Sequence, residues 1–334
     1  MKTAFVVQSA GVLRRDGARV VVEVGHEEKG RLATEELEQL VVMGDLTLTP
    51  AVIDLLVERG VDVVLLTRNG RFRARVGRGA TGNVRLRLAQ YELVAREPAR
   101  CLGLARAFVA AKVSNQRVLL LRQARRGGAA RFASAARAMR ACLAQLPLAS
   151  TLDEVRGIEG AAASVYFRAF GLAFDDPAFR FEKRTRRPPL DPVNALLSLG
   201  YTLLLERVRG AVEAVGLDPE LGVLHAPQAG RPSLVLDLME ELRTPLVDAL
   251  VVAAVNLGAI EPGHFEDAGP GEPVVVRREG LRRFAELFGR RLERRVRPAG
   301  SEERVTFRHL MFRQAQAFAR AVSQGETYSG YMVR

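Results

Sequence analysis

The sequence contains four side chains that could transfer protons or bind a ligand: Glu159, His225, Asp237 and Glu240. Glu159 lies in the run GIEGAAASVYF, a predicted helix whose small residues would let another backbone or a ligand approach the carboxylate. His225 ends the run GVLH, before a loop rich in proline and glycine. Asp237 and Glu240 share one face of a helix that we expect to begin at Ser233 as N-cap. Each residue alone also suits a structural or solvated position, so the residue types leave both interpretations open.

A basic loop precedes the helix predicted in RTRRPPLDPVNALLSLGYTLL. Asp191 is a predicted N-cap with Pro192 as the first helical residue, and Asn194 and Tyr201 lie two turns apart on one face. A helix start explains Asp191 and Pro192, but it does not explain the four cations that come just before, which are Lys183, Arg184, Arg186 and Arg187.

The net charge of +12 is concentrated in one segment. Residues 1–75 and 141–334 are each neutral overall, whereas residues 76–140 carry 14 basic side chains against Glu92 and Glu97. A positive field of this kind attracts nucleic acid, and the planar guanidinium of arginine suits phosphate. A genome rich in G and C would explain arginine in place of lysine, but it would not explain so few acids in one segment.

The first part of the chain is predicted to be β-rich. Runs of Val and Leu favour strands at 3–8, 19–24, 37–43 and 61–66, with a further strand at 71–76. Asp16-Gly17 and Asn69-Gly70 are typical of tight turns. Thr49 and Pro50 predict the start of a short helix that ends near residue 59.

From residue 84 onward the apolar residues recur at helical spacing. Gly127-Gly128 is expected to separate two helices, and further helices are predicted at 151–171, 191–215, 233–258, 279–296 and 304–322. The fold class is therefore α+β: a small N-terminal β-rich domain (1–76), a glycine-rich linker (77–83) and a large all-helical domain (84–322). The tail 323–334 has little to bury and is predicted to be mobile.

Several classes of protein are excluded by composition and pattern. Apolar residues make up 48% of the chain, which rules out a disordered protein. The run GRGATG imitates a dinucleotide-binding loop, but the strand RFRARV before it is charged and no strand follows the next helix, so we interpret it as a linker. Cys101 and Cys142 form neither a disulfide framework nor a metal knuckle. The longest uncharged run, 192–205, is short for a spanning helix, so we expect a cytoplasmic protein without a membrane anchor.

Four motifs together resemble the CRISPR-associated integrase of spacer acquisition, the Cas-one family. They are GIEGAAASVYF, RRPPLDPVNALLSLGYTLL, LDPELGVLHAPQAGRPSLVLDLMEELR and AKVSNQRVLLLR, the last with Asn115 and Gln116. The resemblance spans nearly the whole chain. It implies a metal-dependent DNA endonuclease and integrase that inserts short DNA fragments into the CRISPR array.

The resemblance also implies which residues act. Glu159, His225 and Glu240 would hold a divalent metal, and Asp237 would be a ligand, a support for one, or a charge facing DNA. Oxygen ligands with one imidazole suit Mg²⁺ or Mn²⁺, and phosphodiester transfer needs such a Lewis acid. The nucleophile in integration is a DNA 3′-hydroxyl, which agrees with the lack of a candidate catalytic Ser or Cys. His225 acting as a general base is an alternative that the sequence leaves open.

DNA contacts are predicted in the basic segment and the basic loop, at Arg122, Arg125, Arg126, Lys183, Arg184, Arg186, Arg187 and Arg231. The resemblance further implies a homodimer through the β-rich domain and assembly with the Cas-two protein, flanked by two dimers. Two alternatives stay open: a structure-selective nuclease of branched DNA without an integration role, and a non-enzymatic DNA-binding scaffold.

Overall fold

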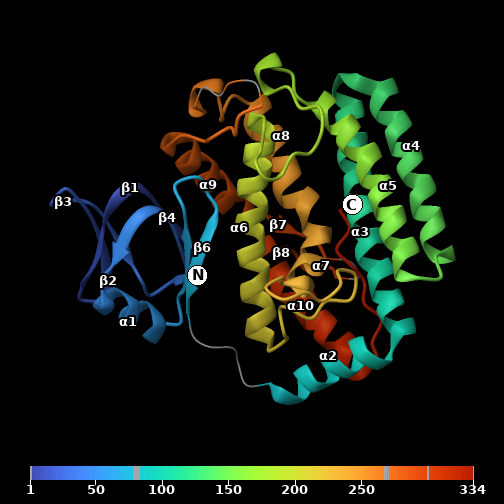
Figure 1. The fold of residues 1–334 in the computed structure, drawn as a ribbon, viewed down its shortest axis with the longest axis horizontal. Coiled ribbons are helices and arrows are strands. Elements are labelled where there is room, and N and C mark those ends of the chain that lie inside the picture. The colour runs from blue at the N-terminus through green and yellow to red at the C-terminus, as the bar shows by residue number, and fades with distance from the viewer. Residues whose placement is uncertain (1, 78–82, 267–268, 270, 299–300, 334) are drawn as a thin grey trace.

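The N-terminal domain is a six-stranded mixed sheet with one helix packed against it (Figure 1). The computed structural model describes the chain except residues 1, 78–82, 267–268, 270, 299–300 and 334, so most of the predicted linker lies outside the described residues. The strand order is β3-β2-β1-β4-β5-β6, and β4 is parallel to β1 and β5 while the other pairs are antiparallel. The bounds are β1 (Lys2–Asp16), β2 (Arg19–Val24), β3 (Glu27–Ala33), β4 (Leu37–Leu48), α1 (Pro50–Glu58), β5 (Asp62–Leu66) and β6 (Phe72–Val76).

The predicted turns set the strand pairing of this sheet. Gly17 and Gly70 have φ values of +60° and +71°, the left-handed region that tight turns require. The strand β3 was not predicted, because charged side chains interrupt its apolar pattern; it lies at the edge of the sheet, where such charges are common. Helix α1 begins after Thr49 as predicted, but the Thr49 hydroxyl donates to the Leu13 carbonyl instead of capping the helix.

The C-terminal domain is mostly helical, as predicted. A two-stranded hairpin, β7 (Arg295–Val296) with β8 (Val305–Thr306), corrects the expectation that it is helical throughout. The helices are α2 (Val84–Arg96), α3 (Pro98–Gln123), α4 (Ala129–Gln145), α5 (Leu152–Phe170), α6 (Pro192–Val215), α7 (Ser233–Leu242), α8 (Ala249–Asn256), α9 (Arg278–Leu292) and α10 (Phe307–Gln324).

Two π-helical segments replace simpler predicted features. The segment η1 (Ala124–Gly128) joins α3 to α4 at the expected glycine pair. The helix predicted over 233–258 is divided by η5 (Arg243–Asp248) into α7 and α8, because Pro245 has no N–H and cannot continue the α-helical ladder. The expected N-cap Ser233 is instead the first residue of α7, and its hydroxyl donates to the Ala226 carbonyl.

Helix α6 runs between the β domain and the rest of the helical domain (Figure 1). Its N-cap is Asp191, as predicted, which accepts a hydrogen bond from the Asn194 N–H at 2.8 Å. Arg75 of β6 pairs with Glu213 of α6 at 2.6 Å and so ties the two domains together. No helix in the described part of the chain combines the length and apolar character needed to cross a membrane.

The C-terminal tail differs from its prediction. Tyr328 and Tyr331 are each only 4% exposed, so the tail does bury side chains and is part of the core. The rings of Tyr328 and Phe108 lie 5.0 Å apart, centre to centre, in an edge-on contact. The expectation of a mobile tail was wrong because it weighed composition and missed two aromatic anchors.

Candidate active site

Two of the predicted acidic residues meet at one lysine. Lys112 of α3 lies between α5 and α7, and its ammonium contacts Glu159 of α5. The same ammonium lies 2.6 Å from Glu240 Oε2 of α7. Helix α3 packs against both α5 and α7, so side chains from three distant parts of the sequence converge there.

The Glu240 carboxylate is buried but remains ionised. Burial on its own would raise its pKa, but Arg243, Lys112 and His225 outweigh burial and lower the pKa of Glu240 to about 2. Arg243 Nε lies 3.0 Å from Glu240 Oε1. Glu240 Oε2 faces the Lys112 ammonium at 2.6 Å, a charge-assisted contact that favours the ionised carboxylate. A buried carboxylate oxygen in this state is suited to a cation.

His225 is held by Asp237, which is completely buried. Asp237 Oδ1 lies 2.6 Å from His225 Nδ1, and its carboxylate also accepts from the N–H groups of Val223, Leu224 and His225 at 2.7, 3.0 and 3.0 Å. A carboxylate at Nδ1 favours the tautomer with the proton there and leaves the Nε2 lone pair free. A Cβ at Gly222 would lie 2.6 Å from Asp237 Oδ2, so the glycine of the GVLH run permits this close approach.

These contacts change the role expected for Asp237. Its oxygens are occupied by the backbone and by the His225 ring, and it cannot face DNA. Asp237 is therefore a positioning residue for His225, a role often found for the partner of a metal-binding histidine.

The predicted metal ligands are partly brought together. Glu159 and Glu240 both contact the Lys112 ammonium, and His225 is close enough to lower the pKa of Glu240. Among the residues that the structure describes, no three histidine, cysteine or acidic side chains form a group that could hold a metal ion. The convergence of all three residues on one ion therefore stays a prediction.

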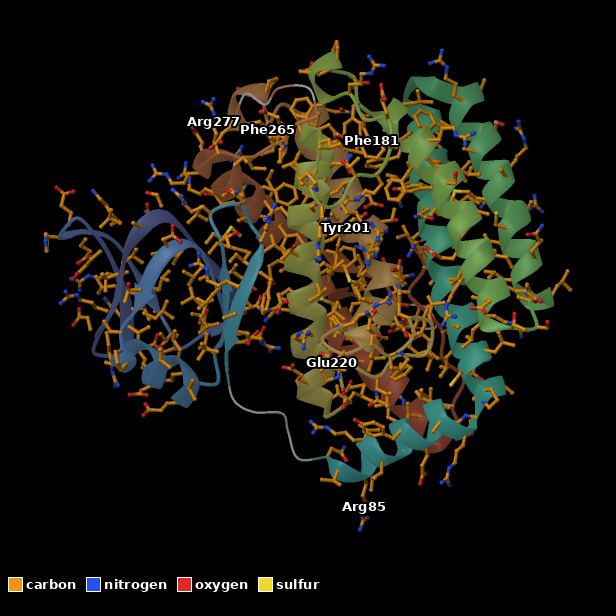
Figure 2. The ribbon with its side chains drawn as sticks, in the orientation of Figure 1. Arg85, Phe181, Tyr201, Glu220, Phe265 and Arg277 are labelled. Carbon is orange, nitrogen blue, oxygen red and sulfur yellow. The ribbon has the colours of Figure 1, made fainter. Side chains whose placement is uncertain are left out.

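A second buried network adjoins Glu240 through Arg243. The Arg243 guanidinium lies 4.7 Å from the centre of the Tyr201 ring, which is near the middle of the helical domain (Figure 2). Tyr201 donates to Asp248 Oδ1 at 2.5 Å, and Tyr166 of α5 donates to Asp248 Oδ2 at 2.7 Å. Tyr201 of the α6 motif thus orients Arg243, which in turn stabilises the Glu240 anion.

The opposite side of α7 is held by the C-terminal tail. Glu241, the neighbour of Glu240, accepts from the Tyr331 N–H at 2.8 Å and from the Tyr328 hydroxyl at 3.2 Å. Asn115 donates to the Glu241 and Tyr331 carbonyls at 2.7 and 2.8 Å. A Cβ at Gly330 would lie 2.6 Å from Glu241 Oε2, so only glycine allows the tail this close. We call Asn115, Glu241, Tyr328 and Tyr331 the tail clasp.

The predicted DNA contacts fall into two groups. The exposed ones are Arg122, Arg125, Arg126, Lys183, Arg186 and Arg187, while Arg231 is half-buried. Arg184 is different, because its guanidinium donates to Asn194 Oδ1 at 2.6 Å and Ser198 Oγ at 3.0 Å and lies over the Tyr201 ring. Arg184 therefore fixes the loop on α6 and is not placed to bind DNA.

Sequence reasoning missed Lys112, Arg243 and the tail clasp. A signal for Lys112 was present, since it is one of four lysines in a chain with 50 basic residues and lies in the middle of a helix. Arg243 is three residues after Glu240 and so lies on the same face of the helix. Nothing in the local sequence indicates that Glu241 and Asn115 would meet a tail more than 80 residues away.

Comparison with known proteins places this architecture in one class. Residues 5–290 match the family model described as CRISPR associated protein Cas1. The chain is 38% identical over 330 residues to "CRISPR-associated endonuclease Cas1 2" of Rhodospirillum rubrum, covering 96% of this chain and 94% of the relative. It is 35% identical over 328 residues to "CRISPR-associated endonuclease Cas1 1" of Chlorobaculum tepidum, with 96% and 95% of the two chains covered.

Solved structures share the whole fold. A CAS1 protein from Thermotoga maritima has a TM-score of 0.83 at 25% identity, with 100% of both chains covered. A casposase bound to integration product has a TM-score of 0.86 at 24% identity, covering 99% of this chain and 93% of that one, which shows the fold alone. The β domain, the helical domain and the site between α3, α5 and α7 thus define a CRISPR-associated protein. The chain belongs to the Cas1 family, many of whose relatives are named endonucleases.

Proposed function

We propose that this protein is a metal-dependent DNA endonuclease and integrase of CRISPR adaptation. One observation carries the proposal: carboxylates from α5 and α7 meet at the ammonium group of Lys112, beside a histidine that a buried aspartate orients. This is a set of groups suited to a divalent ion and to phosphodiester chemistry. The curated relatives, named endonucleases, and the casposase structure with its integration product support the same reaction class.

Glu159, Glu240 and His225 would hold the ion, Mg²⁺ or Mn²⁺. The bound ion would act as a Lewis acid on the phosphodiester and neutralise charge on its oxygens. The residues fit it, because Glu240 stays ionised when buried and its Oε2 already faces a positive charge, the Lys112 ammonium, at 2.6 Å. Lys112 already contacts both carboxylates, so it would compete with the ion for them.

The remaining residues would orient the groups that react. Asp237 keeps the His225 Nε2 lone pair available, whether His225 binds the ion or takes a proton from the attacking hydroxyl. The DNA 3′-hydroxyl would be the nucleophile in integration, so the protein need not supply one. The exposed arginines at the end of α3 and the basic loop before α6 would bind the DNA backbone.

Assembly is a further part of this proposal. We infer a homodimer through residues 1–76, with an isologous interface, and association with the Cas2 protein, flanked by two dimers. The exposed edge strand β3, at the end of the sheet away from α6, supports a partner there, and two solved complexes of similar fold contain Cas1 and Cas2. Light scattering of the full chain should give twice the monomer mass, and a monomer at micromolar concentration would refute the dimer.

The decisive experiment combines cleavage and joining in one assay. A labelled DNA with a free 3′-hydroxyl is incubated with a supercoiled plasmid, Mn²⁺ and either the parent protein or Glu159→Gln. Asp153→Asn is the matched control, because Asp153 lies on the same helix but is 89% exposed and pairs only with Arg156. We expect joining with the parent and the control, and none with Glu159→Gln or with EDTA.

The other results have distinct meanings. Cleavage of branched DNA without joining would indicate a structure-selective nuclease. DNA binding without either reaction would indicate a scaffold. Equal joining by the parent and Glu159→Gln would refute the assignment of the site.

A further inference from the structure

A pocket of about 220 Å³ lies where the end of α3, the end of α9, the β7–β8 hairpin and the C-terminal tail meet. Six arginines line it, and among its described lining residues there is no aspartate or glutamate. We call this set the arginine pocket: Arg122, Arg291, Arg294, Arg295, Arg297 and Arg304.

The fold brings these arginines together from distant segments. Arg291 is in the last turn of α9, and the hairpin that follows pairs Arg295 with Thr306, which brings Arg304 alongside. Arg122 comes from the last turn of α3. Tyr331 forms another wall, and Asn115 holds it there through its carbonyl at 2.8 Å. The tail that was expected to be mobile is thus part of the pocket.

The described lining of the arginine pocket supplies positive charge and no carboxylate. Burial, followed by the neighbouring Arg294 and Arg122, lowers the pKa of Arg291 to about 10, which shows that like charges are crowded there. Arg291 donates to the Pro245 carbonyl at 2.7 and 3.0 Å, which fixes it without neutralising it. At the rim Arg297 lies 3.7 Å from Glu302, whose side chain is 95% exposed, and such surface pairs contribute little.

A larger cavity in the molecule shows the contrast. It has a volume of about 680 Å³, lies between the two domains, and has both acids and arginines in its walls. There Asp62 and Glu213 pair with Arg75, and Glu38 pairs with Arg308 at 2.8 Å. In that cavity arginines pair with carboxylates, whereas the described lining of the arginine pocket contains no carboxylate.

We propose that the arginine pocket binds a backbone phosphate of the DNA on which the protein acts. This inference rests on the proposed function. Guanidinium groups match phosphate oxygens in pairs, and the pocket is smaller than the roughly 300–1,000 Å³ of sites that enclose whole small molecules, so it suits a compact anionic group. Arg122 is ten residues after Lys112 on α3, or roughly 15 Å along the helix axis. A strand that reaches the Glu159–Glu240 site could therefore place another of its phosphates in the pocket.

An acidic peptide is the alternative ligand, and the structure favours DNA. The exposed Arg125 and Arg126 continue the positive surface beyond Arg122, as a polyanion with repeated phosphates would require.

The test measures DNA affinity without metal, so that binding is separated from catalysis. A fluorescent duplex with a single-stranded 3′ end is titrated with full-length protein in EDTA over a range of salt concentrations. The variant is Arg294→Ala/Arg304→Ala, and the control is Arg59→Ala/Arg282→Ala, which removes two exposed arginines outside the pocket. We expect the slope of log K against log salt to become shallower by about 0.7–0.9 in the variant, since the pocket is assigned one phosphate and each lost phosphate contact changes the slope by that amount. The control should keep the parent slope.

The conservative pair Arg294→Lys/Arg304→Lys protects the test against misfolding, because it retains both charges. It should keep the parent slope while losing several-fold in affinity, and thermal melting should show all variants folded. If the Ala pair binds DNA with the affinity and slope of the control, the proposal is wrong. An unchanged DNA affinity with lost binding of an acidic peptide probe would assign the pocket to a protein partner instead. If the parent protein does not join DNA at all, the proposed function is refuted, but the DNA-binding result for the pocket is unaffected.

Discussion

Two neighbouring glutamates on opposite faces of α7 have pKa values that are shifted in opposite directions. Glu240 and Glu241 are both buried, at 4% and 0% exposure. The pKa of Glu240 is lowered to about 2, whereas burial raises the pKa of Glu241 to about 7. The difference lies in their partners, because Glu240 faces Arg243 and Lys112 while Glu241 meets uncharged donors from the tail clasp and from Gln314.

This contrast separates the proposed metal ligand from a structural acid of the same type. An ionised buried carboxylate is held ready for a cation, and its partners are themselves charges that a cation could displace. A carboxyl group that is partly protonated at neutral pH instead anchors the chain, since neutral hydrogen bonds tie it to Tyr328 and Tyr331. Burial alone does not identify the functional acid; the charges facing it do.

The largest expected effect compares the two glutamates directly. Glu240→Gln should lower DNA joining by more than about 100-fold, since loss of a ligand should exceed the roughly 10–100-fold cost of losing a ligand's supporting group. Glu241→Gln should stay within a few-fold of the parent, because glutamine resembles the protonated carboxyl group. Initial rates of joining with saturating Mn²⁺ measure both.

The thermal stability of each variant has to be measured alongside its activity. Glu240 is buried and pairs with Lys112 and Arg243, so its replacement removes the carboxylate that balances their charge. Glu159→Gln is the second variant, since the Glu159 side chain is 28% exposed and its loss disturbs the core less. Both variants should lose joining while a thermal melt shows them folded. Comparable losses in Glu240→Gln and Glu241→Gln would contradict the distinction between the two faces.

The next effect is on stability as a function of pH. The pKa of Glu241 is raised from 4.5 to about 7 in the folded protein, so the folded state holds a proton that the unfolded state releases. The contribution of Glu241 to stability is therefore fully present below pH 4.5, falls as pH rises through this window, and is lost above about pH 7. The raised pKa corresponds to about 3 kcal/mol of free energy of unfolding at most. The free energy of unfolding in urea should be measured near pH 5 and near pH 8 for the parent and for Glu241→Gln. The difference between the two pH values should be smaller in the variant by the contribution of Glu241.

Glu206 provides the control for that measurement. Burial also raises its pKa to about 7, and it lies on α6 away from the tail clasp. Glu206→Gln should remove its own share and leave that of Glu241, and the double variant should lose both shares. An unchanged pH dependence in Glu241→Gln would mean that its carboxyl group is ionised in the fold.

Much of this architecture could be predicted from local sequence, and the long-range contacts that were missed share a cause. Turn signals, helical periodicity and the N-cap Asp191 depend on neighbours in the chain, and the structure confirms them. The meeting of Glu159 with Glu240 followed from family resemblance. Lys112 between them, and the tail against Glu241, depend on packing between residues far apart in sequence. Such contacts leave no periodic trace, so composition wrongly suggested a mobile tail.

A smaller effect is expected at the support of His225. Asp237→Asn keeps the shape but offers an N–H₂ group where Nδ1–H and three backbone N–H groups need acceptors. Loss of a histidine's orienting carboxylate typically lowers metal affinity or activity by about 10–100-fold. Joining rates over a Mn²⁺ titration should show a raised metal requirement. A rate equal to the parent at every Mn²⁺ concentration would show that His225 needs no support.

The smallest effect refines the Glu241 side of the comparison. Tyr328→Phe removes the hydroxyl that donates to Glu241 and accepts from Gln314, but keeps the ring packed on Phe108. The expected loss is about 1–2 kcal/mol of free energy of unfolding, since one hydrogen bond goes and Gln314 loses an acceptor. Because that hydroxyl helps to lower the pKa of Glu241, the pKa should rise further, and the loss should be larger near pH 8 than near pH 5. In the Glu241→Gln background the same substitution should have an effect independent of pH. A loss that is equal at both pH values in the parent background would show that Tyr328 stabilises the tail by packing and not through the Glu241 carboxyl group.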